Sequence, residues 1–108
     1  MPLAHTTRAL RATEIVAALA KLEGWTLSGD GDSLAIEKAF GFANYYQTVA
    51  FVNAVAFIAH AQDHHPELLL QQRQCLVRWR SHDVQGISQA DFECARRVDA
   101  LQPEPAPS

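Results

Sequence analysis

Residues 45–67 read YYQTVAFVNAVAFIAHAQDHHPE, and this stretch sets the centre of the fold. Residues 45–61 contain few helix breakers and many apolar side chains, which predicts a long helix and the most buried one. Pro66 has a fixed φ and no backbone N–H, so the helix must end before it. His65 should therefore leave the helix that carries His64, and the two imidazole rings should diverge around one point.

A helix and a hairpin are expected before this stretch. Thr13 can cap a helix over residues 14–22, and Gly24 stands where a left-handed terminator belongs. Turn formers at 28–32 should reverse the chain between a short strand at Trp25 and Leu27 and a second strand. The second strand alternates, with Leu34, Ile36 and Lys38 on one side and Ala35, Glu37 and Ala39 on the other. Asn44 should then cap the long helix.

Two strands and a helix are expected after the histidine pair. Residues 68–70 and 75–80 indicate strands, and the second alternates with Cys75, Val77 and Trp79 on one side. Ser88 and Asp91 form a capping-box-like pattern that opens a helix running to about Leu101. The element order predicts an α+β fold: a four-stranded antiparallel sheet with three helices packed on one face. The other face and the unpaired sheet edges favour self-association, which makes a homo-oligomer the expected state.

Length and composition indicate an ordinary globular domain. The 108 residues fit a single domain over 1–101, and residues 102–108, with three prolines, should form a disordered tail. With 48% apolar and 19% charged residues, the chain can bury one core. A net charge of −3 and the lack of a basic run exclude direct nucleic-acid binding. Arg73, Arg78 and Arg80 instead indicate the solvated face of a strand.

The cysteines and apolar segments bear on the compartment. Cys75 and Cys94 lie in apolar contexts without ligand-like spacing, which predicts buried free thiols in a reducing compartment. Residues 1–13 do not have the form of a signal peptide. The apolar region 49–61 is too short to span a bilayer. A cytoplasmic protein without membrane contact is the expectation.

The histidines suggest either metal binding or proton transfer. His60 and His64 are four residues apart, which is ligand spacing on a helix, and His65 and His82 could add two nitrogens. The His-Glu-x-x-His signature is missing, so we expect no metal. Unmetallated imidazoles suit general acid–base catalysis near neutral pH. His60 is more simply a partly buried polar residue than a catalyst, and His82 taken alone is more simply an ordinary surface residue.

Carboxylates flank these histidines. Asp63 and Asp83 could each orient a neighbouring ring, and helix-end electrostatics would favour a protonated His64. Asp91 is most simply the acid of a helix N-terminus, where its carboxylate would serve backbone amides.

The region from Gly24-Trp25 to Leu101 resembles the pterin-4a-carbinolamine dehydratases, also known as dimerisation cofactors of a homeodomain transcription factor. The matching positions carry the histidine pair, the later histidine and an aspartate at the family spacing; they are Phe40, Phe42, Asp63-His64-His65-Pro66-Glu67, Ser81-His82, Gly86 and Asp91. The resemblance implies a dimer or a dimer of dimers. It also implies removal of water from a 4a-hydroxytetrahydropterin to give the quinonoid dihydropterin, in support of aromatic amino acid hydroxylases. Neither a metal nor an organic cofactor is implied.

The resemblance also implies roles for particular residues. His64 and His82 would be the acid–base pair, and His65 and Pro66 would line the pterin pocket. The backbone of Ser81, His82, Asp83 and Val84 would face the pterin ring, with Asp91 supporting His82 from behind.

Two positions depart from the family pattern. His60 stands where the family usually has an acid that would help to hold the pterin, and Gln72 stands where most members have an aromatic residue in a strand. The main alternative is a protein-binding or dimerisation module that docks a partner on the helix over 45–61. In that helix Val49, Val52 and Ala56 share helical spacing, which is more typical of core or self-assembly surface.

Overall fold

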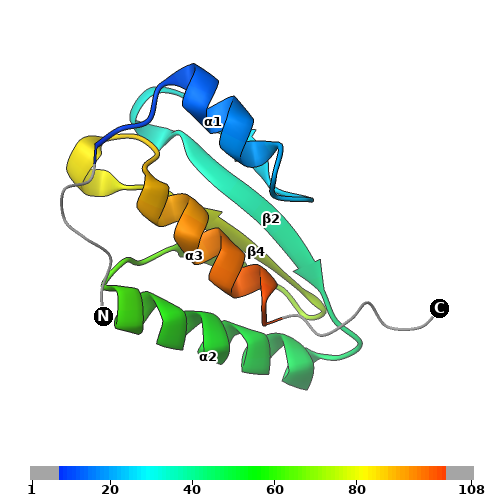
Figure 1. Cartoon of the computed structure of the whole chain (residues 1–108). Helices are drawn as coiled ribbons and strands as arrows, with labels where there is room; N and C mark the ends of the chain where they lie inside the picture. Colours follow the sequence, from blue (N-terminus) through cyan, green and yellow to red (C-terminus); the bar gives the residue numbers. More distant parts are fainter. Residues whose placement is uncertain (1–7, 102–108) are drawn as a thin grey trace.

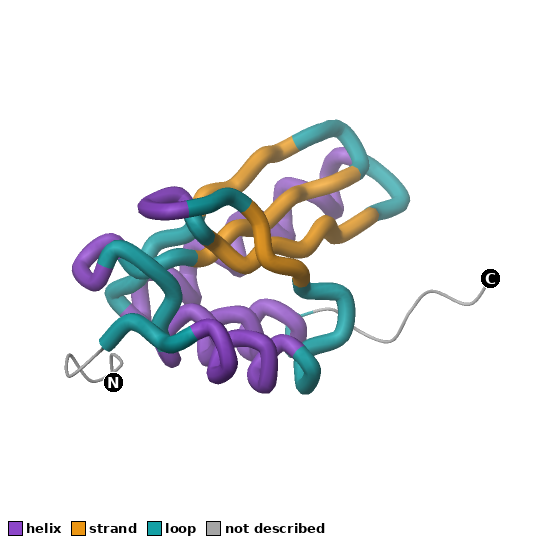
Figure 2. The backbone as a smooth tube through the Cα atoms, turned by 90° about the horizontal axis from the view of Figure 1, so that it is seen from above, coloured by secondary structure: helices purple, strands orange, loops and turns teal. Residues whose placement is uncertain are grey.

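A computed structural model describes residues 8–101 of the chain. A four-stranded antiparallel sheet forms one layer, and three helices cover one of its faces (Figure 1). The view from above shows the strands gathered on one side and most helical turns on the other (Figure 2). The α+β prediction is confirmed. The predicted tail over 102–108 and the first seven residues lie outside the described part of the chain.

The elements follow the predicted order, with two short 3₁₀ turns added. They are α1 (Ala12–Leu19), β1 (Thr26–Ser28), η1 (Gly31–Ser33), β2 (Ala35–Gly41), α2 (Tyr45–Gln62), β3 (Glu67–Leu70), β4 (Gln74–Trp79), η2 (His82–Val84) and α3 (Gln89–Asp99). The sheet order is β1-β2-β4-β3, and every pairing is antiparallel. Within residues 8–101, no helix has the length and apolar character needed to cross a membrane.

Helix α1 begins earlier than the sequence predicted. Arg11 occupies the N-cap position, and Thr13 lies inside the helix. The reason is Glu14, whose carboxylate accepts the Arg11 backbone N–H at 2.9 Å and two hydrogen bonds from the Arg8 guanidinium. The hydrogen bonds from Arg8 and then from the Arg11 backbone lower the pKa of Glu14 to about 2. The helix also ends at Leu19, three residues before the predicted end.

Gly24 has the left-handed backbone that its position predicted, with φ of +86°. A Cβ added there would lie 2.9 Å from Cε of Lys38. The Lys38 ammonium is held by Glu23 O and by Asp99 Oδ1, each at 3.0 Å, so its chain cannot move without losing these bonds. Gly24 is therefore required by both backbone and packing.

We expect Gly24→Ala to lower the free energy of unfolding by about 1–3 kcal/mol, because it adds left-handed strain and a clash with Lys38. Urea unfolding followed by circular dichroism measures the change. Gly41→Ala is the matched control, since a Cβ at Gly41 would meet nothing within 4 Å. Equal stability of the two variants would contradict this explanation.

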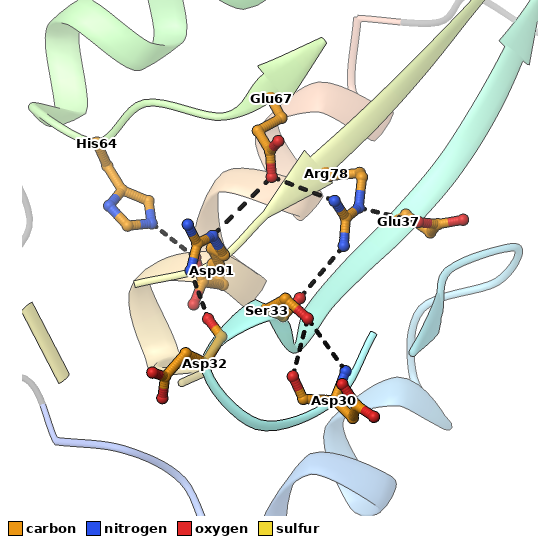
Figure 3. Close-up of polar contacts among 9 residues, drawn as sticks. Asp30, Asp32, Ser33, Glu37, His64, Glu67, Arg78 and Asp91 are labelled. Atoms are coloured by element: carbon orange, nitrogen blue, oxygen red, sulfur yellow. Dashed lines mark hydrogen bonds and ion pairs between the residues drawn. The ribbon is translucent and has the colours of Figure 1, made fainter. Parts of the chain in front are cut away.

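The sheet presents alternate residues to the helices. Ile36, Phe40, Val77 and Trp79 are almost completely buried under them, as the strand alternation predicted. On the opposite face, Arg78 pairs with Glu37 at 3.0 Å and with Glu67 at 3.2 Å (Figure 3).

The predicted solvated strand face is confirmed for Arg78, whereas Arg73 lies in the loop before β4 and Arg80 directly follows the strand. Arg80 also approaches Glu67, at 3.9 Å, and donates to the Asp32 carbonyl in the η1 loop. Gln72 lies in the loop between β3 and β4 rather than in a strand, so the predicted strand position is wrong.

Helix α2 is less buried than predicted. Asn44 caps it as expected, accepting the Gln47 backbone N–H at 2.9 Å. Its buried stripe consists of Thr48, Phe51, Val55, Ala59 and Gln62, not of Val49, Val52 and Ala56. Tyr46 is 84% exposed and Phe57 is 74% exposed. The apolar side chains of this helix occur on all of its sides, so composition could not identify the side that packs on the sheet.

The two thiols are buried and unpaired, as predicted. Burial raises the pKa of Cys75, and burial together with the Asp91 charge raises the pKa of Cys94 to about 12. Both groups should remain neutral thiols at neutral pH, where only a thiolate reacts rapidly.

We therefore expect native protein to show almost no reaction with a colorimetric disulfide reagent at neutral pH. Two thiols per chain should react after unfolding in denaturant. Absorbance of the released thiolate provides the count. Rapid labelling of either thiol in native protein would show that its site opens freely.

Candidate active site

The end of α2 directs His64 back toward the molecule. The Asp63 N–H donates to the His60 carbonyl and the His64 N–H donates to the Ala59 carbonyl, which together form a Schellman motif. Asp63 takes the left-handed position of this motif, with φ of 51°. The helix therefore ends at Gln62, and His64 lies outside it. The predicted ligand spacing of His60 and His64 on one helical face does not occur.

His64 lies between a carboxylate and an indole. Its Nε2 is 2.6 Å from Asp91 Oδ1, and its ring is stacked on Trp79 with centroids 5.5 Å apart and planes at 10°. The His64 side chain keeps 16% of its surface exposed, whereas that of Asp91 is fully buried. Figure 3 shows the His64 ring directed toward Asp91 on α3. A partly exposed ring backed by a buried acid is an arrangement suited to proton transfer.

Asp91 is held by the first turn of α3. Its Oδ2 accepts the Ser88 backbone N–H at 2.9 Å and the Ser81 hydroxyl at 2.8 Å. The Ser88 side chain in turn accepts the Ala90 N–H at 3.2 Å. The predicted capping box of Ser88 and Asp91 is confirmed. Oδ1 of Asp91 takes no part in the box and bonds the His64 imidazole instead.

Two predicted contacts are different in the structure. Asp91 supports His64 rather than His82, because the first turn of α3 lies against the end of α2. Ser81 does not offer free backbone groups: its N–H donates to the Gly86 carbonyl, and its own carbonyl accepts from Val84 and Gly86. Ser81 is 1% exposed and faces inward.

The remaining predicted site residues are exposed or half-buried. His82 is the first residue of η2 and directly follows Ser81. Ser81 and His64 bond the two oxygens of the same Asp91 carboxylate. The exposed positions are His60, Asp63, His65, His82 and Asp83, and the half-buried ones are Pro66 and Val84. Within residues 8–101, no hydrogen bond joins the ring of His82 to that of His64 or His65.

The same part of the chain has no ready-made metal site. Among residues 8–101, no three histidine, cysteine, aspartate or glutamate side chains form a group that could hold a metal ion. The zinc alternative therefore has no geometric support here.

Sequence reasoning missed Ser88 and Trp79 as site residues. Ser88 was recognised only as a helix cap, and Trp79 only as an inward residue of a strand. Ser81 could have been predicted to face inward, because it continues the alternation of Cys75, Val77 and Trp79.

Comparisons with known proteins agree with this fold. The family model described as "Pterin 4 alpha carbinolamine dehydratase" matches residues 8–101. The chain belongs to the pterin-4a-carbinolamine dehydratase family.

Bacterial relatives cover most of this chain. A protein of Paracidovorax citrulli is 63% identical over 98 residues, which is 91% of this chain and 84% of the relative. One of Bdellovibrio bacteriovorus is 50% identical over 98 residues, covering 87% and 78% respectively. Each is named as a pterin-4-alpha-carbinolamine dehydratase whose activity is marked as undemonstrated.

Solved structures share the fold. A transcriptional coactivator/pterin dehydratase from Brucella melitensis has a TM-score of 0.82 and 27% identity, over 89% of this chain and all of the other. A pterin dehydratase-like protein identified as a RuBisCO assembly factor in the alpha-carboxysome has a TM-score of 0.62 and 26% identity, over 73% and 89%. Proteins that are described with different roles therefore share this fold.

Proposed function

We propose that this chain removes water from a 4a-hydroxytetrahydropterin to give the quinonoid dihydropterin, as a step in recycling the cofactor of aromatic amino acid hydroxylases. The observation that carries the proposal is the 2.6 Å contact between His64 and the buried Asp91 in a member of this family. A carboxylate that holds one nitrogen of an imidazole leaves the other free for a proton transfer.

The dehydration requires two proton transfers. The bond between C4a and the hydroxyl oxygen breaks, and the oxygen takes a proton from an acid and leaves as water. The electron pair of a ring nitrogen forms the new double bond to C4a, and a base takes the proton from the pterin. His64 and His82 are the proposed acid and base, and positioned groups of this kind contribute about 10²- to 10⁴-fold in rate.

Neighbouring residues would bind the pterin. His65 and Pro66 follow His64 directly, and Asp83 and Val84 follow His82, so both segments can approach one flat heterocycle. His60 would contact the substrate from the last turn of α2. Asp63 would support the site through its left-handed backbone. Such a reaction needs no metal or organic cofactor, because both transfers use imidazoles.

A direct test is the decay of a freshly generated pterin carbinolamine, followed by stopped-flow absorbance. Purified protein should accelerate the decay in proportion to its concentration, above the spontaneous rate. Decay at the spontaneous rate at every protein concentration would refute the dehydratase proposal.

The exposed side of α2 supports a second candidate, a protein-binding or self-assembly function. Tyr46 and Phe57 are eleven residues apart, so they lie on the same side of the helix, away from the buried stripe. A single copy of the chain leaves both large rings in water, and an interface along this side of the helix would bury them. Light scattering of Phe57→Glu against the natural chain would reveal a smaller assembly if α2 mediates a dimer or tetramer.

A further inference from the structure

Three hydrogen bonds run in series from Ser88 to His64. The Ser88 and Ser81 hydroxyl oxygens are 2.6 Å apart, Ser81 Oγ is 2.8 Å from Asp91 Oδ2, and Asp91 Oδ1 is 2.6 Å from His64 Nε2. Ser81, Ser88 and Asp91 are each at most 1% exposed. Water therefore cannot replace a missing partner in this series without opening the structure.

The series has only one consistent direction when Asp91 is ionised. A hydroxyl carries one hydrogen, and an ionised carboxylate can only accept. The Ser81 hydrogen goes to Asp91, so the hydrogen between the two hydroxyls must come from Ser88. The Ser88 oxygen remains free to accept the Ala90 N–H, which it does.

The ionised Asp91 carboxylate decides the tautomer of His64, and the serine hydroxyls hold that carboxylate in place. Asp91 Oδ2 already has two donors, Ser81 and the Ser88 N–H, and Asp91 Oδ1 has the imidazole alone. An acceptor at 2.6 Å requires the hydrogen to be on Nε2. The neutral ring must then present an unprotonated Nδ1.

We propose that Asp91 selects the Nε2–H tautomer of His64, so that Nδ1 is the nitrogen that exchanges a proton with the substrate. Ser81 and Ser88 are the positioning residues that hold Asp91 in line with Nε2. The catalytic part of this proposal rests on the dehydratase function, whereas the tautomer does not depend on it. Because Ser81 immediately precedes His82, the same series also sets the start of the η2 segment relative to His64.

Nitrogen-15 NMR of protein labelled at histidine tests the tautomer directly. At alkaline pH, where the ring is neutral, the His64 signals should show a hydrogen on Nε2 and none on Nδ1. A predominant Nδ1–H form in the natural chain would overturn the proposal without any mutation.

Variants test the serines. Ser81→Ala removes a hydrogen bond to the charged Asp91 and should lower kcat by about 10- to 100-fold with little change in KM. Ser88→Ala removes the bond between the two hydroxyls, so its effect should be smaller and in the same direction. Each variant should raise the share of the Nδ1–H form, because Asp91 is then held less firmly opposite Nε2. Ser81→Thr keeps the hydroxyl and should restore the Nε2–H form. Ser28→Ala is the control, because Ser28 is a half-buried serine of β1 outside this series.

The two proposals fail separately. A natural tautomer and rate in both alanine variants would overturn the role of the serines. A shift of tautomer in a protein without pterin turnover would support the positioning role and refute only the dehydratase.

Discussion

His64→Ala should lower kcat for the pterin carbinolamine by about 10²- to 10⁴-fold, the usual loss when a general acid or base is removed. The imidazole joins the buried Asp91 to the partly open surface of the site. Its removal also leaves Asp91 Oδ1 without its donor. Stopped-flow absorbance at saturating substrate measures the effect on kcat apart from that on binding.

His64→Gln separates proton transfer from packing. A glutamine side chain can still donate an amide hydrogen toward Asp91, but it cannot exchange a proton at neutral pH. The variant should fold and bind the pterin while remaining as slow as His64→Ala. Recovery of most of the rate by glutamine would mean that His64 only fills space.

His82→Ala should cause a loss of similar size, because the two proton transfers need two groups. His5→Ala is a matched control, since position 5 lies outside the residues that the family matches. Natural rates in both His64→Ala and His82→Ala would show that neither histidine moves a proton in the reaction.

Asp91→Asn should have the largest effect on stability, about 2–4 kcal/mol in the free energy of unfolding. Asp91 accepts from His64, Ser81 and the Ser88 backbone while fully buried. An asparagine amide group would face one or more of these donors with hydrogens of its own. The unmatched donors cannot reach water, so their desolvation is not offset.

Thermal unfolding gives a convenient measure, since about 1 kcal/mol shifts Tm by roughly 4–8 °C in a domain of this size. Asp32→Asn is the control, because Asp32 is an exposed aspartate whose contact with Arg80 uses its backbone carbonyl. A Tm equal to that of the control would contradict the role assigned to Asp91.

Local patterns predicted much of the fold. The alternation of β4 identified its buried side, and Asn44 and Ser88 were recognised as helix caps because each bonds within its own first turn. The cap of α1 was missed because Arg8 and Glu14 together favour an earlier start. Such a pair competes with local propensity and is not visible in the apolar pattern.

The site was predicted in its residues but not in its pairing. His64 and Asp91 were both identified, yet their contact joins positions 27 residues apart and depends on how α3 packs against the end of α2. No periodicity encodes that packing. The left-handed Asp63 that turns the chain toward α3 was also hidden, since aspartate adopts this backbone less readily than glycine.

A crystal structure with a dihydropterin bound would show whether the two histidine segments share one substrate. We expect a flat ring in contact with both segments, with His64 and His82 nitrogens about 2.6–3.2 Å from pterin atoms or one water away. A pterin bound elsewhere on the chain, with the His82 ring directed away from His64, would contradict this expectation.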